Sequence, residues 1–410
     1  MRKFSNLLQT LLILNGILSF VVGLFFGGEP GSAIGTFYSL FVSGVAILGL
    51  LFIPCMALNR NIPKLVFLPQ LFLFFWGVSG LWPVSSILGP FQTHLIFSVG
   101  QVLLGLLALL YFYSLNRSSL FLTPEMFSAS GFKIGHFIGF GIGCLLSLPL
   151  CMLLFGFSLT SSYVDKLSGG FVRLGIDGLY MTERVYRLDD KRIRLAGMIH
   201  IGDQSYYNDL AQSISSGRTL VLAEGVSDQD GLLKEKFSYG GIADFLGLEV
   251  QEKMALDGRT IDVKLLSHAD FQGAENGQPD ITRADIDLRE FDPQTLAFIN
   301  ALGTHLLNND SFADGYAAFN RWAEEHVTPE TNGLIMADLI SRRNQVVLGH
   351  LDAALKKYDT IVIPWGALHM VGIEESVLAR GFSLSGSQER RSIDFSKIPY
   401  AELFEKLSAD

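Results

Sequence analysis

The chain has 410 residues, of which 49% are hydrophobic and 17% charged, and its net charge is −9 at pH 7. This composition is too apolar for an ordinary soluble domain, so part of the chain is expected to face lipid. Residues 1–160 hold six of the 31 basic and two of the 40 acidic residues, which leaves an acidic second part. Nucleic-acid binding needs a basic surface, so this acidic part argues against a nucleic-acid partner.

The first 160 residues contain five apolar stretches without Asp, Glu, Lys or Arg. Each is long enough to be a transmembrane helix, because about 20 helical residues cross the ~30 Å hydrocarbon layer. A cleavable signal peptide is the weaker interpretation of the first stretch, since no small-residue cleavage site is evident. The sequence therefore predicts an α-helical membrane domain over 1–160, with spans near 7–27, 34–58, 65–84, 94–115 and 134–157.

The positions of the six basic residues predict an orientation. They fall in the N-terminal tail, between spans two and three, and between spans four and five. Lys and Arg in short loops stay cytoplasmic, which places the N-terminus inside. An odd number of spans then puts residues 161–410 outside a bacterial-type cytoplasmic membrane, in the periplasm or beyond. All three cysteines lie in the spans, so the outer domain offers no thiolate ligand or thiol nucleophile.

Residues 161–410 are numerous enough for one α/β domain. FVRLGI, LYMTERVYRL and RIRLAGMIHI are expected to be strands, separated by turns at 177–178 and 189–191. A helix at SYYNDLAQSISS, a buried strand at TLVLAEG and a helical tract over 295–358, broken at 327–329, follow. The chain then reads as a strand, TIVIPWGALH, and a helix, GIEESVLARGF. We expect a central mixed sheet flanked by helices.

Two GxxH motifs end predicted strands, at 197–200 and 366–369. Either histidine alone would more often be structural, but the matched contexts favour a site for His200 and His369. Neutral imidazole can bind a metal or move a proton, and open α/β sheets build sites at the carboxyl ends of their strands. Gly197 and Gly366 suit backbone that takes an unusual φ or passes close to another group.

Three carboxylates and an arginine are further candidates. Glu224 ends a buried strand, where a carboxylate is ion-paired, metal-bound or shifted in pKa, and we expect it beside His200 on one sheet edge. Arg343 is placed to stabilise an oxyanion or to orient Glu224, although Arg342 next to it fits a solvated basic patch equally well. Asp285 and Asp287 alternate along a predicted strand and are candidate second ligands, with exposed turn aspartates as the alternative.

The chain contains no HExxH, GxSxG or P-loop motif. Instead, GMIHIG, LAEGV, SRRN and WGALHMVGIEESVLARGF resemble the TraB/PrgY/GumN family over roughly residues 180–385. This family is related to the Tiki metalloproteases, the erythromycin esterases and ChaN-like haem-binding proteins. The resemblance implies an α/β fold and, in the Tiki branch, a peptidase dependent on manganese or cobalt. It assigns the site to His200, Glu224, Arg343 and His369, with Gly197 and Gly366 supporting the turns, whereas Arg342 stands where relatives often have Glu.

The leading hypothesis is a membrane-anchored hydrolase acting on a peptide or protein outside the cytoplasm. His200, Glu224 and His369 would hold a divalent ion, for which manganese, cobalt and zinc all suit the donors, or would activate water directly. A metal-free, esterase-like hydrolase and a non-catalytic protein that binds a peptide or haem are the alternatives. A transporter is less favoured, because the spans lack the charged residues that mark ion pathways.

Overall fold

The computed structural model describes residues 1–26, 33–117, 119–127, 130–214, 217–234, 248–251, 254, 256–268, 270–271, 273, 278–307 and 312–401. The chain forms two compact units, Met1–Tyr163 and Val164–Asp410, called here the membrane unit and the α/β unit. The division falls inside helix α6 (Ile134–Ser168), whereas the sequence predicts a boundary at residue 160.

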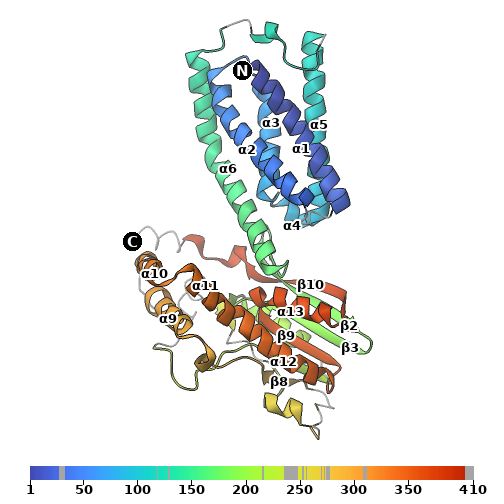
Figure 1. Ribbon diagram of the computed structural model, residues 1–410, viewed down its shortest axis with the longest axis vertical. Coiled ribbons are helices and arrows are strands. Elements are labelled where there is room, and N and C mark those ends of the chain that lie inside the picture. The colour runs from blue at the N-terminus through green and yellow to red at the C-terminus, as the bar shows by residue number, and fades with distance from the viewer. Residues whose placement is uncertain are drawn as a thin grey trace. The chain divides into compact units, whose positions relative to one another are not determined.

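Among the described residues of the membrane unit, four helices are long and apolar enough to cross a membrane. The part of this unit that the structure describes also contains two shorter helices and a 3₁₀ turn at Pro124–Phe127. In Figure 1 the long helices lie side by side as a bundle. The four long helices are α1 (Arg2–Phe26), α2 (Ala33–Leu58), α5 (Pro90–Asn116) and α6, and the short ones are α3 (Lys64–Ser79) and α4 (Val84–Leu88).

The third predicted span, 65–84, is shorter than the sequence suggests. Helix α3 ends at Ser79 because Gly80 takes a left-handed φ of 112° and caps the helix. Its 16 residues extend about 24 Å, which is less than the ~30 Å of a hydrocarbon layer. Hydropathy runs on past Gly80, so an apolar window cannot detect where the helix stops.

Small residues let α1 and α5 approach closely. A Cβ at Gly16 would lie 2.9 Å from Val102 Cγ2, and one at Gly105 would lie 2.4 Å from Ile13 Cγ1. Close packing of this kind holds helices together where lipid removes the hydrophobic driving force. It also brings the buried polar side chains of the two helices into contact.

The α/β unit is built on a mixed sheet, as predicted. The strand order is β1-β2-β3-β9-β5-β8-β7, and β10 pairs with β2. The pairs of β2 with β1, β3 and β10 are antiparallel, whereas β3, β9, β5, β8 and β7 run parallel. A second small sheet joins β4 and β6. The strands are β1 (Val172–Leu174), β2 (Gly178–Leu188), β3 (Lys191–Met198), β4 (Ile201–Gly202), β5 (Thr219–Ala223), β6 (Glu249–Val250), β7 (Arg259–Thr260), β8 (Asp280–Arg283), β9 (Thr360–Gly366) and β10 (Ser383–Asp394).

Helices follow or flank these strands, and the predicted break at 327–329 is confirmed. There Thr328 caps α11 through its side chain, and Pro329 occupies the first turn of that helix. Short 3₁₀ turns lie at Val263–Ser267, Leu288–Glu290 and Phe395–Lys397, and π-helical segments at Leu302–Leu307 and Ala337–Arg342. The helices are α7 (Gln204–Ser213), α9 (Pro293–Ala301), α10 (Phe312–His326), α11 (Pro329–Met336), α12 (Arg343–Leu355) and α13 (Ala367–Ala379).

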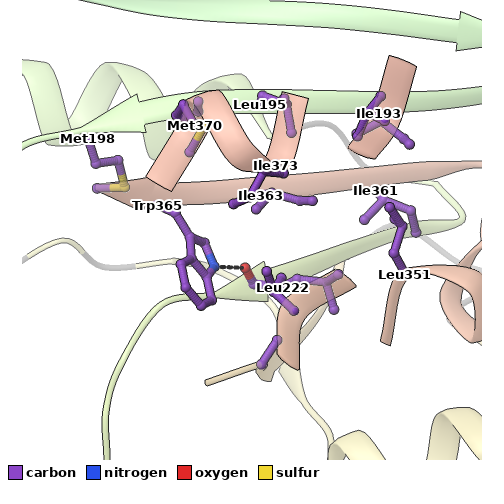
Figure 2. Close-up of a cluster of buried hydrophobic side chains, with 14 of the residues drawn as sticks. Ile193, Leu195, Met198, Leu222, Leu351, Ile361, Ile363, Trp365, Met370 and Ile373 are labelled. Atoms are coloured by element: carbon purple, nitrogen blue, oxygen red, sulfur yellow. Dashed lines mark hydrogen bonds between the residues drawn. The ribbon is translucent and has the colours of Figure 1, made fainter. Parts of the chain in front are cut away.

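The core forms because successive strand residues point to opposite faces of the sheet. On β9, Ile361 and Ile363 belong to the main core with residues of α7, α12 and α13, while Val362 joins a smaller cluster. Figure 2 shows Trp365 at the end of β9, where its indole nitrogen donates to the Leu222 carbonyl oxygen at 2.8 Å. This bond ties together the ends of β9 and β5, where Glu224 follows.

Gly197→Ala is expected to destabilise the fold. An added Cβ would lie 3.3 Å from the Phe171 Cβ and from the Thr182 carbonyl oxygen, closer than an ordinary contact. Overpacking of this kind costs ~1–3 kcal/mol, so we expect the Tm to fall by roughly 2–10 °C. Thermal unfolding of the full-length chain in detergent, followed by circular dichroism, measures the change.

The matched control is Gly366→Ala. Here an added Cβ would lie 3.5 Å from Glu224 Oε2 and 3.6 Å from His369 Cδ2, which are ordinary contacts. Its φ of −49° is also accessible to alanine. We expect a much smaller change in Tm, and an equal loss in both variants would contradict the close approach at Gly197.

Candidate functional site

The two GxxH motifs begin at the same level on neighbouring parallel strands. The β3–β9 register pairs Gly197 with Trp365 and Met198 with Gly366. Both motifs therefore emerge at one edge of the sheet, as their carboxyl-end positions predict. His369 lies in the first turn of α13, whereas His200 lies between β3 and the short strand β4. Only the second GxxH motif therefore joins a strand directly to a helix.

Glu224 shares this edge but is not beside β3. Strand β9 lies between β3 and β5, so Glu224 and His200 share the expected sheet edge without following neighbouring strands. The carboxylate instead accepts a hydrogen bond from the Gly366 backbone N–H to Oε2 at 2.6 Å. Its Oε1 lies 3.6 Å from Nε2 of His369. Glu224 thereby fixes the start of the second GxxH motif.

Arg343 is a buried cation shared by two carboxylates. Its Nε and Nη2 donate to the two oxygens of Asp285 at 3.0 and 2.7 Å, and Nη2 also donates to Glu224 Oε1 at 2.6 Å. Only 11% of the arginine side chain is exposed. The basic-patch alternative is therefore wrong for Arg343, while Arg342 is half exposed and pairs with Asp338 at 2.5 Å.

The two aspartates have different roles. Asp285 follows β8, and its fully buried side chain also accepts hydrogen bonds from the backbone N–H groups of Gly225 and Ile286. Asp287 caps the 3₁₀ turn at Leu288–Glu290 and accepts from the Ser227 hydroxyl at 2.5 Å. Neither lies in the predicted strand, because β8 ends at Arg283. Asp285 thus belongs to the site as the partner of Arg343, and Asp287 stabilises a turn.

His369 is held from both sides by Asn344. The Asn344 amide donates to the His369 backbone oxygen at 3.1 Å, and its Oδ1 lies 2.8 Å from Nδ1 of the ring. This pairing favours the tautomer with hydrogen on Nδ1, which leaves a lone pair on Nε2. Burial, reinforced by the Arg343 charge, lowers the pKa of His369 to about 4. The ring is therefore neutral at physiological pH and rests edge-on against Trp365.

His200 is exposed at the rim of a pocket of about 450 Å³, called here the site pocket. Helix α7 anchors the backbone that leads from β3 to His200. The Tyr206 hydroxyl donates to the Gly197 carbonyl oxygen at 3.0 Å, and the Tyr207 hydroxyl to that of Ile199 at 2.8 Å. Polar side chains meet apolar walls in the pocket. It is lined by His200, Glu224, Gln251 and Arg343 together with Ala223, Gly225, Val226, Val250, Met254, Leu256 and Pro364.

These donors, as they lie, do not fit the manganese, cobalt or zinc ion that the family resemblance implies. Within the described residues, no group of three or more His, Cys, Asp or Glu side chains is placed to hold a metal. His369 Nε2 and Glu224 Oε1 do converge, but Arg343 already occupies Oε1 and both oxygens of Asp285. A guanidinium this close repels a divalent cation.

Sequence reasoning missed the residues that orient the site rather than line it. Asn344 follows Arg343 directly in SRRN, and its position on α12 gives it the backbone and ring of His369 as partners. Trp365 precedes Gly366 and lies 5.4 Å from the Arg343 guanidinium, measured to the ring centroid. Their adjacency to the motif residues is the only signal in the sequence that could have identified them.

The chain was compared with protein-family models, with curated proteins and with solved structures. None of the three comparisons found a match.

Proposed function

We propose that the chain is a membrane-anchored hydrolase of the TraB/PrgY/GumN type and that the site pocket is its active site. The observation that carries the proposal is the convergence of two lone-pair atoms, His369 Nε2 and Glu224 Oε1, 3.6 Å apart beside a buried arginine. Two acceptors this close together can share one water molecule, which donates one of its two hydrogens to each. A positioned water next to a cation is what hydrolysis of a carbonyl compound requires.

In the proposed reaction, His369 is the general base. Nε2 takes a proton from the water, whose oxygen attacks the substrate carbonyl carbon, and the imidazolium later returns the proton to the leaving group. Arg343 stabilises the negative charge that forms on the carbonyl oxygen, and its four hydrogen bonds use four of its five N–H groups. His200 at the rim hydrogen-bonds the substrate. Asn344 is a positioning residue, because it fixes the tautomer of His369.

A peptide or protein is the proposed substrate. The oxygen Oε1 of Gln251 is buried without a hydrogen-bond partner among the described residues, and Gln251 lines the site pocket. This acceptor suits a peptide N–H, since an unpaired buried carbonyl is costly. The apolar walls, which include Val226, Val250 and Leu256, suit the neighbouring side chain.

The substitutions His369→Gln and Glu224→Gln are expected to lower kcat/KM by about 100-fold or more. The first removes the imidazole base, and the second replaces the anionic carboxylate beside Arg343 by an amide that keeps only one acceptor oxygen. The measurement is cleavage of a mixed fluorogenic peptide library by the full-length chain in detergent. His326→Gln, on the exposed end of α10, is the control and should retain activity. A wild-type chain that binds peptides but cuts neither peptides nor small esters would favour the non-catalytic alternative.

Chelation separates the metal-free mechanism from the metallopeptidase that the resemblance implies. Since Arg343 neutralises the nearby carboxylates, we expect cleavage to persist after treatment with EDTA and to gain little from added manganese or cobalt. Loss of activity with EDTA, restored by either metal, would instead mean that Arg343 releases Glu224 when a metal binds. Metal content by mass spectrometry accompanies the assay.

We further propose that the chain crosses a bacterial-type cytoplasmic membrane five times, with the N-terminus inside and the α/β unit outside. The six basic residues gather at one end of the bundle, where the Arg60 backbone N–H bonds to the Gly131 oxygen and Asn6 to the Leu122 backbone. Two contacts with α6 bracket α3. On the side before α3, the His136 ring lies within hydrogen-bonding distance of the Ala57 backbone oxygen, and on the side after it the Trp82 N–H donates to the Ser158 hydroxyl.

These two contacts are 22 residues apart on α6, or about 33 Å. Helix α3 and the connection that follows it therefore cover the thickness of a membrane together, although α3 alone does not. Five crossings place the six bases on one side, as short cytoplasmic loops require.

Labelling of single cysteines by a membrane-impermeant maleimide tests this topology. In a chain whose Cys55, Cys144 and Cys151 are replaced by serine, exposed Ser385→Cys of β10 should react in right-side-out spheroplasts. Ser130→Cys, exposed between α5 and α6, should react only after lysis. The reverse pattern would place the α/β unit in the cytoplasm.

A further inference from the structure

The membrane unit contains a second pocket, which the proposed hydrolase does not use. It has a volume of about 380 Å³ and lies between α1, α2, α3 and α5, and it is called here the bundle pocket. Ser19, near the end of α1, and Leu81, just beyond α3, contribute to its wall. The pocket therefore lies toward the end of the bundle opposite the basic loops, which is the outer half in the topology proposed above.

Most polar side chains of the bundle pocket bond to one another. The Ser19 hydroxyl lies 3.0 Å from Nε2 of His94 and 2.9 Å from the hydroxyl of Ser98. Outside the pocket, Gln9 and Gln70 exchange two amide hydrogen bonds, at 3.1 and 3.0 Å, and so satisfy each other. A buried amide pair in this bundle can thus be closed, which is what apolar surroundings favour.

Asn15 and Gln101 form an amide pair that is left open. The Asn15 amide nitrogen donates to Gln101 Oε1 at 3.1 Å, but Asn15 Oδ1 and Gln101 Nε2 have no partner among the described residues. The two residues are only 4% and 6% exposed, and both line the bundle pocket. Exchanging the oxygen and nitrogen of both amides again leaves one acceptor and one donor unpaired.

The open pair defines the chemistry of a ligand. To satisfy both open atoms, the ligand must offer one hydrogen-bond donor and one acceptor side by side, and an amide group carries both. Among the described residues, the pocket lining contains no Asp, Glu, Lys or Arg, so a charged ligand would find no counter-ion there in a medium of low dielectric constant. Leu73, Phe74 and Phe97 add apolar walls. We propose that the bundle pocket binds a neutral, amide-bearing small molecule with an apolar substituent through Asn15 and Gln101.

Binding is tested on the full-length chain in lipid nanodiscs with N-acetyl-L-leucinamide as the probe. Saturation-transfer NMR detects contact, and tryptophan fluorescence gives the affinity, because Trp76 packs against Phe97 of the pocket at 5.0 Å. We expect saturable binding of the neutral amide and binding at least about tenfold weaker for N-acetyl-L-leucine, whose carboxylate is charged. Absence of saturable binding, or equal binding of the charged acid, would overturn the proposal and leave a water-filled cavity.

Paired variants locate the site. The double substitution Asn15→Leu with Gln101→Met removes the open pair and should weaken binding about tenfold or more, as expected for two lost hydrogen bonds. The control, Gln9→Met with Gln70→Met, removes the closed pair outside the pocket and should leave affinity within about twofold. Equal effects of the two double substitutions would overturn the assignment. If the first does not fold, the comparison of amide and acid on the wild type decides.

Discussion

The candidate site depends on one buried guanidinium. Arg343 begins α12 and reaches Glu224 after β5 and Asp285 after β8, so a single side chain joins one helix to the ends of two strands. Glu224 in turn accepts a hydrogen bond from the Gly366 N–H and so fixes the end of β9 as well. Burial of either carboxylate without Arg343 would leave an uncompensated charge, which is far costlier than the ion pair itself. The second GxxH motif is therefore positioned by electrostatics as much as by the fold.

The same interaction limits what the site can bind. A cation held at 2.6 and 2.7 Å from the two carboxylates uses the negative charge that a divalent metal would need. The imidazole of His369, made neutral by burial, then remains as the group able to accept a proton. Metal binding to these residues would first require Arg343 to move, so the position of this arginine distinguishes the two mechanisms proposed for hydrolysis.

The sequence predicts the elements better than their arrangement. Hydropathy locates the long helices because lipid selects for apolar length, but it overextends α3, since Gly80 ends that helix through its φ and not through its polarity. Motif spacing identifies His200, Glu224, Arg343 and His369 as candidates. It cannot show that β9, from late in the chain, inserts between β3 and β5, because strand order is set by packing of the whole sheet.

The residues that orient the site were missed for a related reason. Asn344 and Trp365 have no pattern of their own, and their roles arise only when α12 and β9 come together beside α13. Asp287 was predicted to be a second ligand because it alternates with Asp285. The strand ends at Arg283, however, and the Asp287 side chain caps the following 3₁₀ turn. Alternation predicts a shared face only while the backbone stays extended.

The site pocket and the bundle pocket illustrate how the surroundings select the chemistry. In the α/β unit, charged groups are buried because each has an opposite charge within hydrogen-bonding distance. In the membrane unit, where hydrocarbon would make such charges still more expensive, the described polar groups that line the bundle pocket are amides, hydroxyls and one imidazole. An amide pair costs little when closed, as Gln9 and Gln70 show, so the open pair at Asn15 and Gln101 is the exception that a bound ligand would explain. With such a ligand, the proposed role of the membrane unit would extend from anchoring to recognition.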